Sequence, residues 1–135
     1  MANAVTIQTL IDGPRNVVLK VDGYIDTSDY AVADLINPAT LSAIDNATGA
    51  LATQLRIDRI IYTVDEGLCV TLWWDATADV RIIDLVKAGH QELSNFGGFT
   101  NNAGSGKTGK IQISTEGWSV GKVYEFTLTL ELVKQ

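Results

Sequence analysis

Residues 123–133, VYEFTLTLELV, decide the fold class of this chain, because polar and apolar side chains alternate along them. Four apolar side chains fall on one side of an extended backbone: Phe126, Leu128, Leu130 and Leu132. Four polar side chains fall on the other: Glu125, Thr127, Thr129 and Glu131. Successive side chains of a β-strand point to opposite faces, so this pattern is typical of a strand with one buried face. The stretch therefore predicts a half-buried β-sheet.

Six more segments of the chain are rich in β-branched and aromatic residues. They are AVTIQTLI (4–11), RNVVLKV (15–21), QLRIDRIIYTV (54–64), LCVTLWW (68–74), VRIIDLV (80–86) and KIQIST (110–115). The sequence thus predicts about seven strands. Asp12-Gly13-Pro14 is a turn signal that predicts a hairpin between the first two segments, with Val17, Leu19 and Val21 facing inward and Asn16, Lys20 and Asp22 facing outward. Asp65-Glu66-Gly67 likewise predicts a hairpin between segments 54–64 and 68–74.

Two segments depart from the strand pattern. In residues 26–52, Ser, Asp and Ala interrupt the alternation, and we expect a long excursion with at most one or two short helical turns. Ser28 or Asp29 could cap one over residues 30–36, and Pro38 could begin another. Residues 96–109, FGGFTNNAGSGKTG, hold five glycines and predict a long exposed loop with left-handed backbone. Together these features predict a single all-β domain over 1–135, built as an antiparallel sandwich or a small barrel.

Composition excludes several classes of protein. One cysteine and one histidine cannot form an intrachain disulfide or a four-ligand Cys/His zinc site. Ten basic against 16 acidic residues give a net charge of −6, which disfavours binding to nucleic acid. The chain holds no apolar run long enough to cross a membrane, and its first residues lack the basic region of a secretion signal. We therefore expect a protein made in the cytoplasm without a signal peptide, with neither nucleic acid nor membrane as partner.

Candidate catalytic groups are weak. Residues 104–108, GSGKT, resemble the end of a phosphate-binding loop, but Asn101 stands where that motif needs glycine, and a strand rather than a helix is expected to follow. His90 has no serine or cysteine at a characteristic spacing, and Cys69 is expected to be a structural thiol, buried or half exposed. Four acidic residues lack the spacing of a calcium loop and are expected to be solvated: Asp22, Asp26, Asp29 and Asp34. We predict no catalytic residue, cofactor or metal site.

The tryptophans carry more information about function. Trp73 and Trp74 are neighbours in one predicted strand, so they must point to opposite faces, and only one can enter a given core. The other is covered by part of the chain or is an anchor for a partner.

Five segments of the chain resemble those of a known protein family. The carrying segments are residues 15–29, 36–42, 55–77, 96–115 and 124–135, which include INPATLS and FGGFTNNAGSGKTGKIQIST. In their order and spacing they are similar to small virion proteins of tailed bacteriophages, the capsid decoration or cement proteins. The resemblance implies a non-enzymatic, jelly-roll-like β-sandwich whose copies bind the major capsid protein. It implies no individual binding residue.

From these observations we expect a protein that binds the outer surface of a phage head, as a dimer or trimer, and clamps neighbouring capsid subunits. The candidate interface residues are Ala2, Val5, Trp73, Trp74, Phe96, Phe99, Asn101, Asn102, Lys107 and Trp118. Exposed strand edges could pair with another chain, and the glycine-rich loop could become ordered on docking. The alternatives are a tail, adaptor or fibre component, and a carbohydrate-binding module that uses Trp118 or the Asn101-Asn102 pair.

Overall fold

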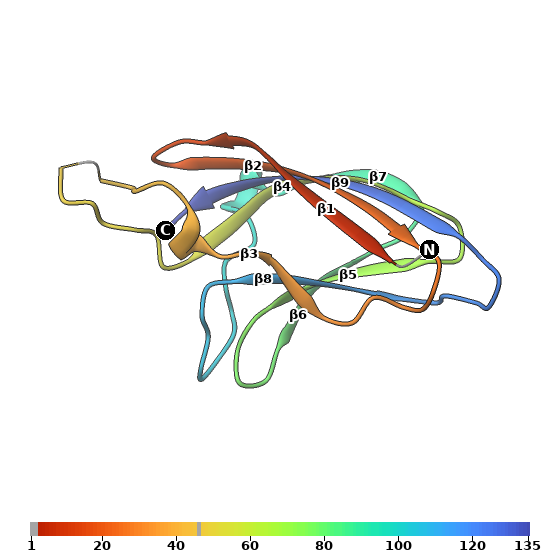
Figure 1. Cartoon of the computed structure of the whole chain (residues 1–135). Coiled ribbons are helices and arrows are strands. Elements are labelled where there is room, and N and C mark those ends of the chain that lie inside the picture. Colours follow the sequence, from red (N-terminus) through yellow and green to blue (C-terminus); the bar gives the residue numbers. More distant parts are fainter. Residues whose placement is uncertain (1–2, 46) are drawn as a thin grey trace.

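The computed structural model describes residues 3–45 and 47–135, and this part of the chain folds into two antiparallel β-sheets packed face to face (Figure 1). The strands are β1 (Ala4–Asp12), β2 (Asn16–Ile25), β3 (Ala33–Ile36), β4 (Leu55–Val64), β5 (Cys69–Trp74), β6 (Val80–Leu85), β7 (Ala88–Glu92), β8 (Ile111–Glu116) and β9 (Tyr124–Lys134). Two 3-10 turns, η1 (Pro38–Thr40) and η2 (Ser94–Phe96), are its helical elements. The prediction of an all-β sandwich with at most two short helical turns is confirmed.

The strand order is that of a jelly roll. One sheet has the order β1-β2-β9-β4-β7 and the other has the order β3-β8-β5-β6. From β2 onward, the first strand pairs with the last, β3 with β8, β4 with β7, and β5 with β6. Eight strands paired in this way form a long hairpin that has rolled up into two sheets, which is the jelly-roll arrangement. β1 is an added strand at one edge.

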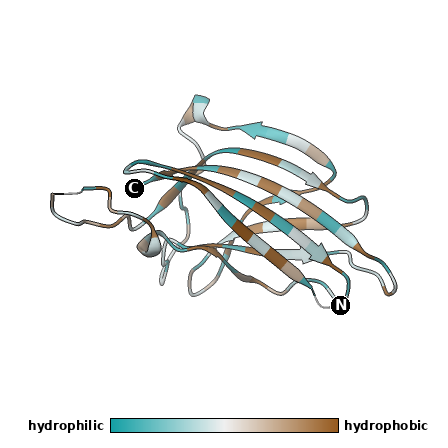
Figure 2. Ribbon diagram, turned by 45° about the horizontal axis from the view of Figure 1, so that its top comes forward, coloured by the Kyte–Doolittle hydropathy of each residue, from teal (hydrophilic) through white to brown (hydrophobic). Residues whose placement is uncertain are grey.

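Alternation along the strands builds the core between the sheets. Along β9, Phe126, Leu128, Leu130 and Leu132 are buried, as the sequence pattern predicts. Val17, Leu19 and Val21 of β2 are buried beside them, and Asn16 and Asp22 are exposed on the outer face. From the other sheet, Leu68, Val70, Leu72 and Trp74 close the core. Figure 2 shows apolar and polar positions alternating along the strands of the five-stranded sheet.

Two predictions about local structure are wrong. Segments 54–64 and 68–74 do not form a hairpin, because β4 pairs with β7 and β9 whereas β5 pairs with β6 and β8. The turn at Asp65 instead carries the chain from one sheet to the other, so the two apolar faces cover each other across the core. Residues 30–36 form no helical turn, since Ala33–Ile36 is a strand that buries Leu35 and Ile36. The expected turn at Pro38 is present as η1, capped by the Asn37 side chain.

The sequence also left two strands out, β3 and β7. β3 is four residues long, and β7 reads AGHQE, which has no β-branched or aromatic residue. Both lie at sheet edges, so each needs only one neighbouring strand to hold it. The excursion over 26–52 is therefore partly regular, and the described part of the segment between η1 and β4 projects beyond the sheets (Figure 1).

Candidate functional site

The two neighbouring tryptophans lie on opposite faces of β5. Trp74 is 1% exposed and belongs to the core, which removes it from the predicted interface. Trp73 lies half-buried on the outer face, where its indole Nε1 donates a hydrogen bond to Ser114 Oγ at 2.8 Å. The guanidinium of Arg81 lies over the Trp73 ring, 5.3 Å from its centroid, in the geometry of a cation–π contact. Trp73 is therefore a partly covered anchor rather than a bare aromatic platform.

The glycine-rich loop over 96–109 is held by backbone contacts along its length. Phe99 exchanges two backbone hydrogen bonds with Ile57 of β4, at 2.8 and 3.0 Å. Near its far end, Thr108 donates to Asp75 through both its backbone nitrogen (3.2 Å) and its hydroxyl (2.7 Å). Ser105 accepts a hydrogen bond from the backbone of Thr77, so this loop and the β5–β6 turn lie side by side. The predicted left-handed glycines are present at 97, 98, 106 and 109, and the first two donate backbone hydrogen bonds to Ser94 (3.2 Å) and Leu93 (2.8 Å).

Two phenylalanines of this loop lie next to each other at the surface. Phe96 in η2 is 65% exposed, and its ring lies 6.2 Å from that of Phe99, centroid to centroid. Phe99 is half-buried and packs against the core. It also lines a shallow hollow of about 340 Å³ together with Arg81 and Asn102. Phe96, Phe99 and Asn102 are thus brought together, as the interface prediction requires, and Arg81 is an addition that the sequence did not indicate.

The other polar residues of the loop have different roles. Asn101 is structural, because its side-chain nitrogen donates to Gln54 at 2.7 Å and its oxygen accepts from the Ala103 backbone at 2.9 Å. Lys107 is exposed. The GSGKT segment is followed by strand β8, so it lacks the helix N-terminus that a phosphate-binding loop needs.

The remaining predicted interface residues do not join this group. Val5 lies in β1 and packs partly against the core. Trp118 lies in the β8–β9 loop, where its backbone nitrogen donates to Asp29 at 2.9 Å and its indole donates to the Lys122 carbonyl at 3.1 Å. Ala2 lies outside the described residues. The predicted surface is therefore divided between several places on the sandwich.

Of the four acidic residues expected to be solvated, Asp22, Asp29 and Asp34 are exposed, and Asp29 and Asp34 also make structural contacts. Asp29 holds the β8–β9 loop through Trp118. Asp34 accepts from Gln112 Nε2 at 2.8 Å and lies 3.2 Å from Lys110 Nζ. The hydrogen bond from Gln112, opposed by burial and supported by Lys110, lowers the pKa of the Asp34 carboxyl. Within residues 3–45 and 47–135, no three His, Cys, Asp or Glu side chains are grouped so that they could hold a metal ion.

The two residues with reactive side chains lie apart. His90 is exposed on β7, opposite Ile61 of β4. Cys69 is half-buried at the start of β5, and burial, together with the charge of Asp84, raises the pKa of its thiol. A raised pKa disfavours the thiolate, so Cys69 fits the structural role predicted for it.

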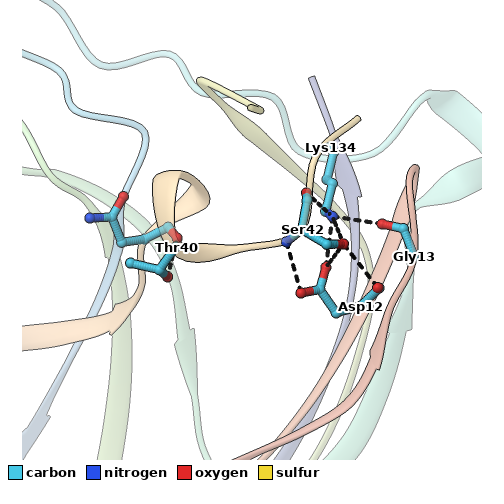
Figure 3. A network of polar contacts seen from close by, with 6 residues as sticks. Asp12, Gly13, Thr40, Ser42 and Lys134 are labelled. Atoms are coloured by element: carbon cyan, nitrogen blue, oxygen red, sulfur yellow. Dashed lines mark hydrogen bonds and ion pairs between the residues drawn. The ribbon is translucent and has the colours of Figure 1, made fainter. Parts of the chain in front are cut away.

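The most buried charge closes one end of the sandwich (Figure 3). Lys134, at the end of β9, has no exposed side-chain surface. Its Nζ donates to Asp12 Oδ1 (2.7 Å), the Gly13 carbonyl (2.6 Å) and the Ser42 carbonyl (2.7 Å). Burial alone would raise the pKa of Asp12, but the hydrogen bonds from Lys134 and Ser42 outweigh it and lower that pKa. The network ties the β1–β2 turn to the segment after η1 and to the last strand.

Sequence reasoning missed two exposed apolar surfaces. One is the projecting segment between η1 and β4, where Ile44 and Leu51 are exposed. The other is β1, which exposes Ile7, Leu10 and Ile11. For the segment between η1 and β4, the sequence offers one signal, which is the presence of apolar residues in a stretch without alternation. For β1, the sequence offers no signal, because it does not show that this strand lies at a sheet edge.

A comparison with protein families found no match to this chain, and a comparison with curated proteins found none. In the described part of the chain, no helix is long and apolar enough to cross a membrane.

Proposed function

We propose that this protein is a non-enzymatic structural component of a phage virion, which binds the outer surface of the capsid and clamps neighbouring major capsid subunits. The contact surface in this proposal is the loop surface of Phe96, Phe99, Asn102 and Arg81, with Trp73 beside it. The observation that carries the proposal is the exposure of Phe96 on a loop whose backbone is already anchored. A rigid exposed aromatic side chain loses little conformational entropy on binding, which is what a protein–protein anchor requires.

Three further features support this function. The jelly roll is an architecture of viral capsid domains, although a fold alone does not establish a function. The net charge of −6 suits the outside of a particle better than contact with the packaged genome. Many copies on a symmetric lattice would also bind with avidity, so each contact surface can be small.

Jelly rolls also occur in lectin domains, so carbohydrate binding is the alternative to a structural role in a virion. The outer-face tryptophan argues against it, because Arg81 lies over the Trp73 ring that a sugar would need to stack on. Asn101 is likewise committed to Gln54 and Ala103.

The test is a particle that lacks this protein. We expect such heads to release their DNA at lower temperature or under milder osmotic shock than complete heads, and added purified protein to restore their resistance. Normal robustness of the depleted heads would contradict the proposal. A particle reconstruction locates the protein independently, and density on the tail would assign it to a tail, adaptor or fibre role instead.

A further inference from the structure

The two sheets have four edge strands, and three of them are protected against pairing with another chain. β3 is four residues long and carries Asp34. β6 carries Arg81 and Asp84, which form an ion pair at 3.1 Å. β7 is five residues long and carries Glu92. Short length and charged side chains are two of the devices by which natural proteins block edge-to-edge association, and β-bulges are a third.

β1 has neither form of protection. It is nine residues long, and none of its residues carries a charge before Asp12 at its end. A bulge between Thr9 and Ile11 interrupts the pairing with β2, which leaves Ala4–Thr9 as a regular edge of six uncharged residues. Three of the eleven large apolar side chains exposed in the described chain lie in β1: Ile7, Leu10 and Ile11. A long, uncharged, apolar edge is an association site unless something covers it.

The edge of β1 also borders a groove between the sheets. β1 and β3 are edge strands on the same side of the sandwich (Figure 1). Between them, a shallow groove of about 340 Å³ has a mixed lining: its apolar residues include Ile7, Leu35, Ile36 and Leu41, and its polar residues include Asp12 and Asp34. Ile7 remains 41% exposed, although it lies opposite the buried Val21 of β2.

We propose that two copies of this chain associate through antiparallel pairing of β1 with β1 of the second copy, which joins their five-stranded sheets into one. A two-fold axis normal to the joined sheet keeps the core-facing sides of both copies on the same side of that sheet. The groove beside β1 of one copy therefore faces the identical groove of the other copy. Both exposed edges and both grooves are then covered by one contact. A strand from a different protein would cover the edge but would bring no second groove.

The charges at this contact are locally compensated. Each copy carries a net charge of −6, which repels a second copy at long range. The two acidic residues that line the groove are each paired with a lysine, Asp12 with Lys134 at 2.7 Å and Asp34 with Lys110 at 3.2 Å. In the segment Ala4–Thr9, antiparallel pairing opposes no like charges, because the segment has none. This association does not depend on which surface of the protein binds the capsid. The oligomer that it produces is a dimer with two-fold symmetry.

The first test is the mass of the purified protein in solution. Light scattering over a dilution series should give twice the chain mass of 14.5 kDa. Ile7→Lys places a positive charge close to the two-fold axis of the pairing. In a single copy this position is 41% exposed, so the lysine can reach water and the monomer can still fold. We expect this variant to have half the wild-type mass. The matched control is Ile61→Lys, which is 38% exposed on β4, far from β1 in the sheet order, and should stay dimeric.

The second test does not depend on how well Ile7→Lys folds. Residues that lie opposite each other in an antiparallel pair point to the same face of the sheet. The two-fold axis must therefore lie midway between one residue and the same residue of the other copy. An axis at Thr6 or at Ile7 gives the greatest overlap of the two six-residue edges. In a Cys69→Ser background, either Thr6→Cys or Ile7→Cys should oxidise rapidly to a covalent dimer. Thr127→Cys, on the outer face of β9, should not.

Three outcomes would overturn the proposal: a wild-type monomer throughout the series, a dimeric Ile7→Lys variant, or no disulfide at either position. A wild-type monomer whose Ile7→Lys variant no longer binds heads would show that β1 pairs with a strand of another protein. A dimer that binds no particle would leave the pairing intact and contradict the proposed function alone.

Discussion

Lys134 Nζ lies 2.7 Å from Asp12 Oδ1, and the two side chains differ sharply in exposure, 0% for the lysine and 28% for the aspartate. The difference matters because removing one member of a buried ion pair leaves the other without compensation for its lost hydration. A stranded Lys134 would have no access to water, whereas a stranded Asp12 would keep some. The two halves of this ion pair are therefore unequal in what their removal costs.

The first prediction follows from this asymmetry. Asp12→Ala should lower the free energy of unfolding by about 3–5 kcal/mol, because it leaves a fully buried ammonium group unpaired. Lys134→Met should cost less, about 2 kcal/mol, because Asp12 can be partly hydrated. Urea denaturation measures both. The control is Lys20→Met, whose exposed pair with Asp22 at 3.7 Å should contribute less than about 1 kcal/mol. Equal losses for Asp12→Ala and Lys20→Met would contradict the assignment.

The second prediction concerns acid. The folded pKa of Asp12 lies below its ordinary value of 3.8, so the stabilisation that it gives is complete well above pH 3.8 and is lost as the pH falls through the folded pKa. Lys134→Met removes the strongest of the interactions that lower this pKa and leaves the hydrogen bonds from Ser42, so the variant should lose less stability than the wild type between pH 5 and pH 2.5. Urea midpoints across that interval provide the measurement. A steeper acid loss in the variant would show that Lys134 does not set the pKa of Asp12.

The third prediction concerns a close contact within the five-stranded sheet. Gly23 of β2 pairs with Phe126 of β9, and a Cβ on Gly23 would lie 2.1 Å from the Phe126 ring. Gly23→Ala must therefore displace the ring and should cost about 1–3 kcal/mol in unfolding free energy. Adding Phe126→Leu should make the two effects non-additive, with a coupling of about 1 kcal/mol or more. Simple additivity would mean that the ring does not pack on Gly23. Gly13→Ala, which meets only ordinary contacts, is the control.

How far the sequence predicts this structure depends on whether a pattern is local. The alternation in residues 123–133 is local, and it correctly places β9 and its buried face. Which strands pair is not local, so the Asp65 turn was interpreted as a hairpin although it crosses between sheets. The same limit applies to the candidate site. Alternation separates Trp73 from Trp74, but which one is buried, and that Arg81 covers Trp73, depends on the packing of the sheets.

The fourth prediction tests whether the glycine-rich loop is anchored before binding. Gly109 has φ +84°, and a Cβ there would lie 2.1 Å from the Thr53 carbonyl oxygen. Gly109→Ala should therefore detach this end of the loop, at a cost of about 3 kcal/mol, and speed its proteolysis. Gly104→Ala is a control in the same loop, since its Cβ would meet nothing within 4 Å. Equal proteolysis rates for the two variants would indicate a loop that is loose in the free protein.

The fifth prediction separates binding from folding at the proposed capsid contact. Phe96 is 65% exposed, so Phe96→Ala should change the free energy of unfolding by no more than about 0.5 kcal/mol. If its ring anchors the protein on the particle, the same change should weaken binding to depleted heads at least about tenfold, as truncating a central aromatic does at other interfaces. Val120→Ala is the matched control, because Val120 is 89% exposed but lies in the β8–β9 loop, away from Phe96. Co-sedimentation with heads measures the affinity. If Phe96→Ala binds like the wild type, or if Val120→Ala loses as much affinity, the contact surface is not on the glycine-rich loop. The exposed Ile44 and Leu51 of the projecting segment would then be the next positions to substitute.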